Sequence, residues 1–190
     1  MGPDGVDSPI PVTTFEDMLE AAKKGEAWAW EHIFRTLAGP ITGYLALRGA
    51  PDPEDQASET LFHVARNIER FEGSEESFRS WVFVIAHRRL IDARRSEGRR
   101  VKTTSLSDRT GPRGDVETEA LNQLALEDMQ ALLSPLTADQ REVITLRMIA
   151  DLSLEETARV MGKRVGSVKA LQRRALVNLK RRLELKEVSR

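Results

Sequence analysis

Apolar residues recur every three or four positions along most of the chain, and no stretch shows the two-residue alternation of a β-strand. Thr13-Thr14-Phe15-Glu16 predicts the start of a first helix, because the Thr oxygen and the Glu carboxylate satisfy free backbone N–H groups. That helix is expected to end at Gly25. Helical patterns follow at 26–37 and 41–47, and Gly39-Pro40 predicts a break between them.

The same period predicts further helices along the rest of the chain, at 54–70, 78–95, 116–133, from Thr137 to about Ile149, and in two short pieces within 152–183. The stretch 71–77 is predicted to be a loop. The fold class is therefore all-α, with an N-terminal helical bundle and a C-terminal helix-turn-helix domain joined by a flexible linker.

The boundaries of the two domains and the linker are predicted from local composition. Residues 1–13 are acidic and rich in proline, which predicts a disordered lead-in, and 101–115 are polar with Ser, Thr, Gly and Pro and predict the linker. The two domains then occupy 14–100 and 116–190. With such a linker, the two domains are expected to move independently.

Leu152 to Leu183 carry the pattern of a helix-turn-helix. Ser153 caps a short helix, Met161-Gly162 make the turn, and a second helix begins near Val165. The N-terminal half of such a second helix enters the major groove, where Arg and Lys pair with guanine edges and phosphates. The predicted contact residues are Arg164, Ser167, Lys169, Ala170, Gln172, Arg173 and Arg174.

Charge is distributed unevenly although the formal net charge is only -1. Residues 79–102 hold eight basic and two acidic side chains, and 157–190 hold eleven basic and two acidic ones. The segments 1–78 and 103–156 are acidic. Two separated basic blocks predict two contacts with a polyanion. The block at 78–100 also carries aromatic residues beside a loop, a combination that can hold unstacked bases.

Other function classes are disfavoured by composition. The chain has no Cys, so disulfides and thiolate metal sites are excluded. No apolar run is long enough for membrane insertion, and no signal peptide is recognisable, so the cytoplasm is the expected location. The acidic group at 52–59 could form a metal site, but His32, His63 and His87 do not have a ligand spacing. No cofactor and no catalytic residue are predicted.

Three motifs in this order resemble the bacterial extracytoplasmic-function (ECF) sigma factor family over about 14–183. They are Asp52-Pro53-Glu54-Asp55 with Glu59-Thr60, the stretch Phe78 to Ala86 with Asp92, and Leu136 to Leu183. The chain departs from the family pattern at Ser58 and Arg88, where Gln and Asn are usual. It also has Ala170-Leu171-Gln172 in place of the common Ser-Arg-Leu.

The resemblance implies a role for each motif. Asp52, Glu54, Asp55 and Glu59 would bind RNA polymerase core. A pocket for flipped minus-ten bases would form around His63, Asn67, Phe71 and Arg88, while the helix-turn-helix would bind the minus-thirty-five element of promoter DNA. Because the family often has one, an anti-sigma factor is a further expected partner.

The sequence therefore predicts a sigma factor, which acts by binding and leaves the chemistry to the polymerase. Two alternatives stay open at this point. A helix-turn-helix regulator would bind DNA without core polymerase, and a metal-dependent helical enzyme would bind neither.

Overall fold

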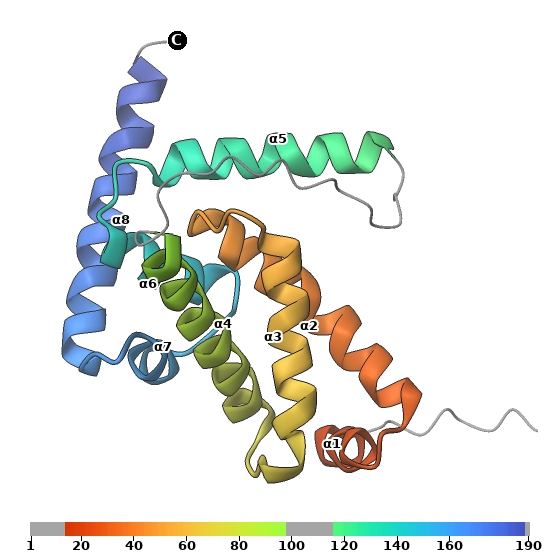
Figure 1. Ribbon diagram of the computed structural model, residues 1–190. Coiled ribbons are helices and arrows are strands. Elements are labelled where there is room, and N and C mark those ends of the chain that lie inside the picture. Colours follow the sequence, from red (N-terminus) through yellow and green to blue (C-terminus); the bar gives the residue numbers. More distant parts are fainter. Residues whose placement is uncertain (1–13, 98–115, 189–190) are drawn as a thin grey trace, which may run out of the picture.

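The computed structural model describes residues 14–97 and 116–188, and every regular element within these ranges is a helix (Figure 1). The lead-in predicted at 1–13 and the linker predicted at 101–115 lie outside the described residues. None of the helices in the described ranges combines the length and the apolar content that a membrane span requires.

The helices fall into an N-terminal and a C-terminal region. The first holds α1 (Phe15–Lys23), α2 (Ala27–Leu47), α3 (Pro53–Asn67), a 3-10 turn (Ile68–Arg70) and α4 (Glu75–Glu97). The second holds α5 (Val116–Leu133), α6 (Ala138–Met148), α7 (Leu154–Met161) and α8 (Val165–Val188).

Side-chain caps explain where several helices begin. The capping boxes predicted at Thr137 and Ser153 are confirmed, since each hydroxyl accepts from the backbone N–H three residues later. The box predicted from Thr13 to Glu16 is wrong by one residue, because Thr14 is the N-cap and Asp17 is its partner. This register places Phe15 in the helix, with its ring 5.7 Å from that of Phe78.

Helix α2 is continuous, so the break predicted at Gly39-Pro40 is wrong. A proline inside a helix costs about 3 kcal/mol or more. Ile33, Leu37, Ile41 and Tyr44 lie on one buried face that runs through this point. Each such side chain stabilises the fold by about 1.5–3 kcal/mol when buried, so the packing on both sides outweighs the proline.

Helix α4 begins at Glu75, three residues before the predicted start at 78. The hydroxyl of Ser74 accepts from the backbone N–H of Ser77, as a capping side chain does. The predicted loop is therefore shorter and ends at Ser74. The predicted helix 54–70 is present as α3 and the 3-10 turn that follows it.

The two regions share one hydrophobic core, contrary to the expectation of independent domains. Leu146, Ala150, Leu152 and Val160 of the C-terminal region belong to the same buried cluster as the core of α1–α4. Helix α7 packs against α4, and the ribbon shows the two helices side by side at a steep angle (Figure 1). Arg159 on α7 also donates to Ser80 Oγ on α4 over 3.2 Å. The chain is closed in this structure.

Candidate nucleic-acid interface

The unit formed by α7 and α8 has the geometry of a helix-turn-helix. Gly162 ends α7 with φ +62°, a left-handed conformation that costs glycine little, so the chain can turn sharply into α8. Val168 and Ala175 on α8 are fully buried. Val168 packs in a small core with Val143 and Ala158, and Ala175 packs in a second one with Leu136 and Ile144. This packing fixes which face of α8 is turned outward.

The outward face of α8 carries most of the predicted DNA contacts. Arg164, Ser167, Lys169, Arg173 and Arg174 are exposed, whereas Ala170 and Gln172 are half-buried. Four of the predicted contacts line a hollow of about 690 Å³ at the start of the helix, namely Arg164, Ser167, Ala170 and Arg174.

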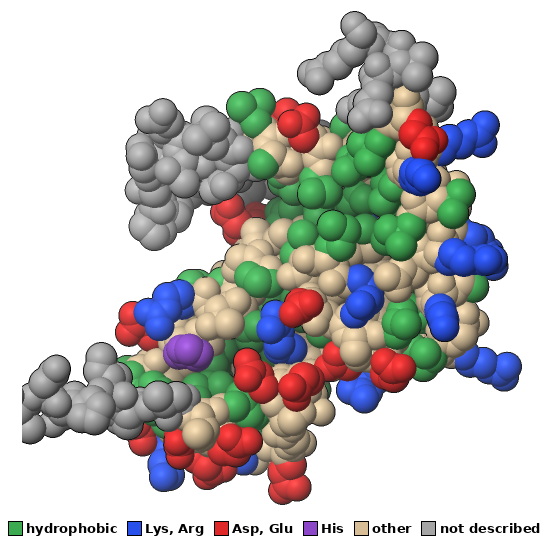
Figure 2. Space-filling view, turned by 180° about the vertical axis from the view of Figure 1, so that it is seen from behind, with side chains coloured by type: hydrophobic (Ala, Val, Ile, Leu, Met, Phe, Trp, Pro, Cys, Tyr) green, Lys and Arg blue, Asp and Glu red, His purple; other side chains and the backbone are tan. Residues whose placement is uncertain are grey.

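Gln172 is half-buried between the buried positions Val168 and Ala175, so it is less available than the five exposed contacts. Lys163 at the edge of the hollow pairs with Asp139 of α6 at 3.1 Å. In Figure 2, Lys and Arg side chains follow the edge formed by α8, and Asp and Glu gather at the opposite end, over the N-terminal region. A polyanion would be attracted to the α8 edge.

The residues predicted for the minus-ten pocket are not all at the surface. His63 and Arg88 are exposed, on α3 and α4, and Asn67 is half-buried with its amide donating to the His63 carbonyl over 2.8 Å. Phe71 is only 9% exposed. Its ring lies 5.2 Å from that of Phe78 and 5.1 Å from that of Trp81, so it belongs to the aromatic core beneath the loop.

The acidic residues at the start of α3 are all exposed. Asp52 is the N-cap and accepts from the Asp55 N–H over 3.0 Å, while Glu59 pairs with Arg89 of α4 at 2.8 Å. One residue on this face was not predicted. Phe62 is 60% exposed and has the guanidinium of Arg66 above its ring. The face therefore combines negative charge with one large apolar side chain.

A buried ionic group between the two regions was also missed by sequence reasoning. Glu142 on α6 enters the N-terminal region, where Arg48 contacts one carboxylate oxygen at 3.1 Å and His87 contacts the other at 2.6 Å. The Tyr44 hydroxyl donates to that second oxygen over 2.9 Å. The only signal in the sequence is a charged residue directly before the apolar pair Val143-Ile144.

The proton positions in this group follow from its hydrogen bonds. Burial and the Glu142 charge raise the pKa of the Tyr44 hydroxyl well above 10.0, so it keeps its proton and donates. A carboxylate can only accept, and therefore His87 Nδ1 carries a hydrogen. Burial alone would raise the pKa of Glu142. The hydrogen bond from His87, the charge of Arg48 and the hydrogen bond from Tyr44 outweigh burial and lower it below 4.5.

The stabilising effect of Glu142 is expected to depend on pH. A pKa lowered in the folded state stabilises the fold above the unfolded value, and the contribution is lost as the pH falls through the folded value. Glu142→Gln should therefore be less stable than the parent protein at pH 7. The difference should shrink as the pH is lowered below 4.5.

Urea unfolding of both proteins between pH 7 and pH 3 measures this difference. Glu155→Gln is the control, because it removes the same charge from an exposed position on α7. A difference between Glu142→Gln and the parent that stays constant over this range would contradict the expectation.

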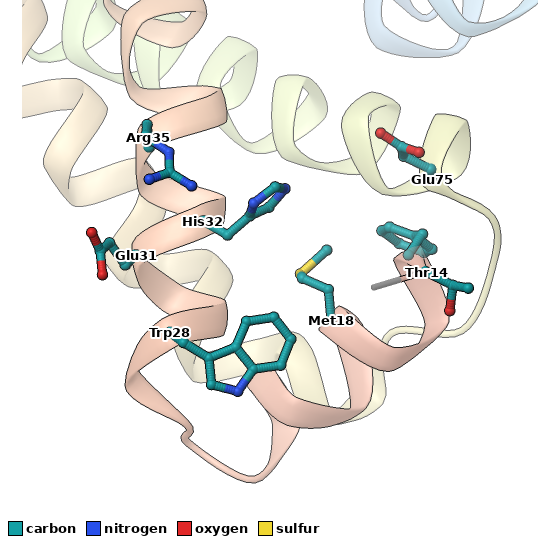
Figure 3. A pocket seen from close by; sticks show the side chains of 8 residues that line it. Thr14, Met18, Trp28, Glu31, His32, Arg35 and Glu75 are labelled. Atoms are coloured by element: carbon teal, nitrogen blue, oxygen red, sulfur yellow. The ribbon is translucent and has the colours of Figure 1, made fainter. Parts of the chain in front are cut away.

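A further hollow, of about 340 Å³, lies between α1 and the start of α2 (Figure 3). His32 and Arg35 of α2 line it beside Met18 of α1. It contains none of the predicted contact residues. Within 14–97 and 116–188 no group of three or more His, Asp or Glu side chains is placed to hold a metal ion.

Comparison with protein families gives two matches in chain order. Residues 33–100 match the family described as Sigma-70 region 2, and residues 126–179 match Sigma-70, region 4. The first match begins within α2 and includes α3 and all of α4. The second contains α6, α7 and most of α8.

Curated relatives cover nearly the whole chain. The ECF RNA polymerase sigma factor BldN of Streptomyces coelicolor is 34% identical over 174 residues, which are 88% of this chain and 65% of BldN. The ECF RNA polymerase sigma factor SigD of Mycobacterium tuberculosis is 31% identical over 171 residues, which are 86% of this chain and 81% of SigD.

Two solved structures have a similar fold. The sigma factor RpoE of Bartonella quintana, solved with the anti-sigma factor NepR, gives a TM-score of 0.60 at 26% identity over 84% of this chain and 97% of RpoE. CnrH, solved with the cytosolic domain of CnrY, gives a TM-score of 0.64 at 22% identity over 88% of this chain and 96% of CnrH.

Proposed function

Because the chain belongs to the family of ECF RNA polymerase sigma factors, we propose that it binds RNA polymerase core and directs it to promoters for the start of transcription. The observation that carries the proposal is the basic outer face of α8, set on a helix-turn-helix and preceded in the same chain by a sigma-70 region 2. In this proposal the same chain contacts a promoter twice, through α8 and through the part that matches sigma-70 region 2.

Each surface has a distinct part in this proposal. The outer face of α8 binds the minus-thirty-five duplex, where Arg173 and Lys169 are best placed to read bases. His63, Asn67 and Arg88 contact unpaired minus-ten bases, and Phe71 supports their loop from inside the core. Capture of flipped bases offsets the few kcal/mol that unstacking costs.

The acidic face of α3 is assigned to RNA polymerase core, and Phe62 extends it. Exposed charge around one large apolar anchor is a common arrangement at protein interfaces. In this proposal the protein is not an enzyme, since the polymerase forms every bond. Its place of action is the cytoplasm, and an anti-sigma factor is a further partner, as for the RpoE of B. quintana.

Co-purification and transcription test the function together. Tagged protein mixed with purified core polymerase should elute with it in the absence of DNA. The complex should give defined starts in run-off transcription on a genomic library. A chain that binds promoter DNA but never core polymerase would be a helix-turn-helix regulator, and the proposed function would be wrong.

Reversal of one charge on the acidic face is expected to weaken the complex with core polymerase. Asp55→Lys should lower the affinity about tenfold, mainly through slower association, because charges at an interface steer encounter. Glu31→Lys makes the same change at an exposed position of α2 and should have no effect. Surface plasmon resonance at two salt concentrations measures both variants, and equal affinities would contradict the assignment.

A further inference from the structure

The surface of the N-terminal region that receives Glu142 is built for an anion. Three different donors converge on one carboxylate, from Tyr44 on α2, Arg48 at the end of α2 and His87 on α4. The side chain of Arg48 is only 5% exposed. Arginine, histidine and tyrosine donors around one point are also suited to a phosphate oxygen.

Both terminal nitrogens of Arg48 donate to acceptors on the C-terminal region. One terminal nitrogen donates to the Ala138 carbonyl over 2.9 Å and the other to Glu142 over 3.1 Å. Its Nε is buried and has no hydrogen-bond partner among the described residues. When the two regions separate, this guanidinium therefore loses these two acceptors. One donor position is unused even in the closed chain.

A further positive charge lies beside the same place. Arg94 on α4 donates to the backbone carbonyl of Arg48. Burial, followed by the charge of Arg48, lowers the pKa of Arg94, as expected where cations are crowded. Within this cluster the carboxylate of Glu142 is supplied by the other region. Separation would leave a basic surface that attracts a polyanion.

The closed chain is too small to span a promoter. The minus-ten and minus-thirty-five elements are about 25 base pairs apart, which is about 85 Å of duplex. A compact chain of 190 residues has a radius of gyration of only about 16 Å. The residues 98–115, fully extended, would reach about 60 Å. Binding to both elements therefore requires Glu142 to leave its site.

We propose that Tyr44, Arg48 and His87 form an anion site, which Glu142 fills while the chain is closed and a phosphate of promoter DNA fills once it opens. This inference rests on the proposed function, and it adds a DNA contact and a means of regulation to it. Closure and DNA binding then compete for one site. The carboxylate of Glu142 stands in for the DNA phosphate.

Removal of the competing carboxylate is the first arm of the test. The chain has no cysteine, so Thr36→Cys and Lys180→Cys introduce two label sites, one in each region. Spin-label distances should be short and narrow in the parent protein and longer and broader in Glu142→Gln. On an unlabelled background, Glu142→Gln should bind a random-sequence 30-base-pair duplex about tenfold more tightly. Glu155→Gln should match the parent in both measurements.

Removal of the site itself is the second arm. Arg48→Met added to Glu142→Gln should leave the chain open but return DNA binding toward the parent level. The slope of log affinity against log salt should fall by about 1, as for the loss of one phosphate contact. If Arg48→Met yields no folded protein, Tyr44→Phe replaces it and should weaken binding about threefold.

Several results would overturn the proposal. Glu142→Gln could remain closed with the affinity of the parent protein. The double variant could bind DNA as tightly as Glu142→Gln, which would make the contact a latch without a DNA site. The double variant could instead keep its affinity for DNA and lose affinity for core polymerase, which would assign the site to a carboxylate of the polymerase. The DNA and distance measurements use no polymerase, so failure of the proposed function would show separately, in co-purification.

Discussion

Phe71→Ala is expected to destabilise the N-terminal region by about 3–5 kcal/mol, the usual cost of removing a buried phenylalanine. The ring is 9% exposed and lies 5.1 Å from Trp81 in a nearly parallel arrangement. Its edge-to-face contact with Phe78 is lost as well. Such aromatic pairs contribute about 0.5–1.5 kcal/mol beyond the area that they bury.

Urea unfolding followed by circular dichroism measures the loss, and the chain offers a matched control. Phe62→Ala removes the same side chain from a position that is 60% exposed, so it should change the free energy of unfolding by less than about 0.5 kcal/mol. Equal losses for the two variants would show that Phe71 is not a core residue.

The rate at which the Phe71→Ala variant opens a promoter distinguishes two roles of this ring, which are support of the loop and direct contact with bases. A ring that touches flipped bases would leave a folded variant whose slow opening is partly rescued by a pre-melted bubble, since the unstacking cost is then met in advance. A destabilised region would fail on duplex and bubble alike. Permanganate footprinting on both templates at a temperature where the parent protein is folded distinguishes the two.

The helices were predictable because their signals are local. The capping boxes at Thr137 and Ser153 and the turn at Gly162 are set by side chains within a few residues, and the sequence contains all of them. The break predicted at Pro40 failed for the opposite reason. Whether a proline interrupts a helix depends on the burial of Leu37 and Ile41, which only the tertiary structure reveals.

The candidate surfaces were predictable to different degrees. The outer face of α8 follows from helical periodicity alone, so five of its seven predicted contacts are exposed. The place of Phe71 did not follow, because an aromatic residue at the end of a helix fits a core and a base pocket equally well. Glu142 contacts Arg48, which lies 94 positions earlier in the sequence, and no local pattern pairs residues so far apart.

Lys169→Ala and Arg173→Ala are expected to weaken binding to the minus-thirty-five element, each by about 1–3 kcal/mol if the side chain reads a base. That corresponds to about 5- to 150-fold in affinity. Both side chains are exposed on the N-terminal half of α8, the part of a recognition helix that enters the major groove. A base contact should relax the preference at one position, whereas a phosphate contact should weaken all sequences alike.

Lys180→Ala is the matched control for this pair. Lys180 is exposed on nearly the same side of α8, eleven residues beyond Lys169 or about 16 Å along the axis, and it lies beside Glu184 at 3.8 Å. Fluorescence anisotropy on promoters mapped by run-off transcription, and on the same duplexes with single substitutions, compares the three variants. If Lys180→Ala costs as much as the other two, α8 binds through its overall charge and its N-terminal half does not read the sequence.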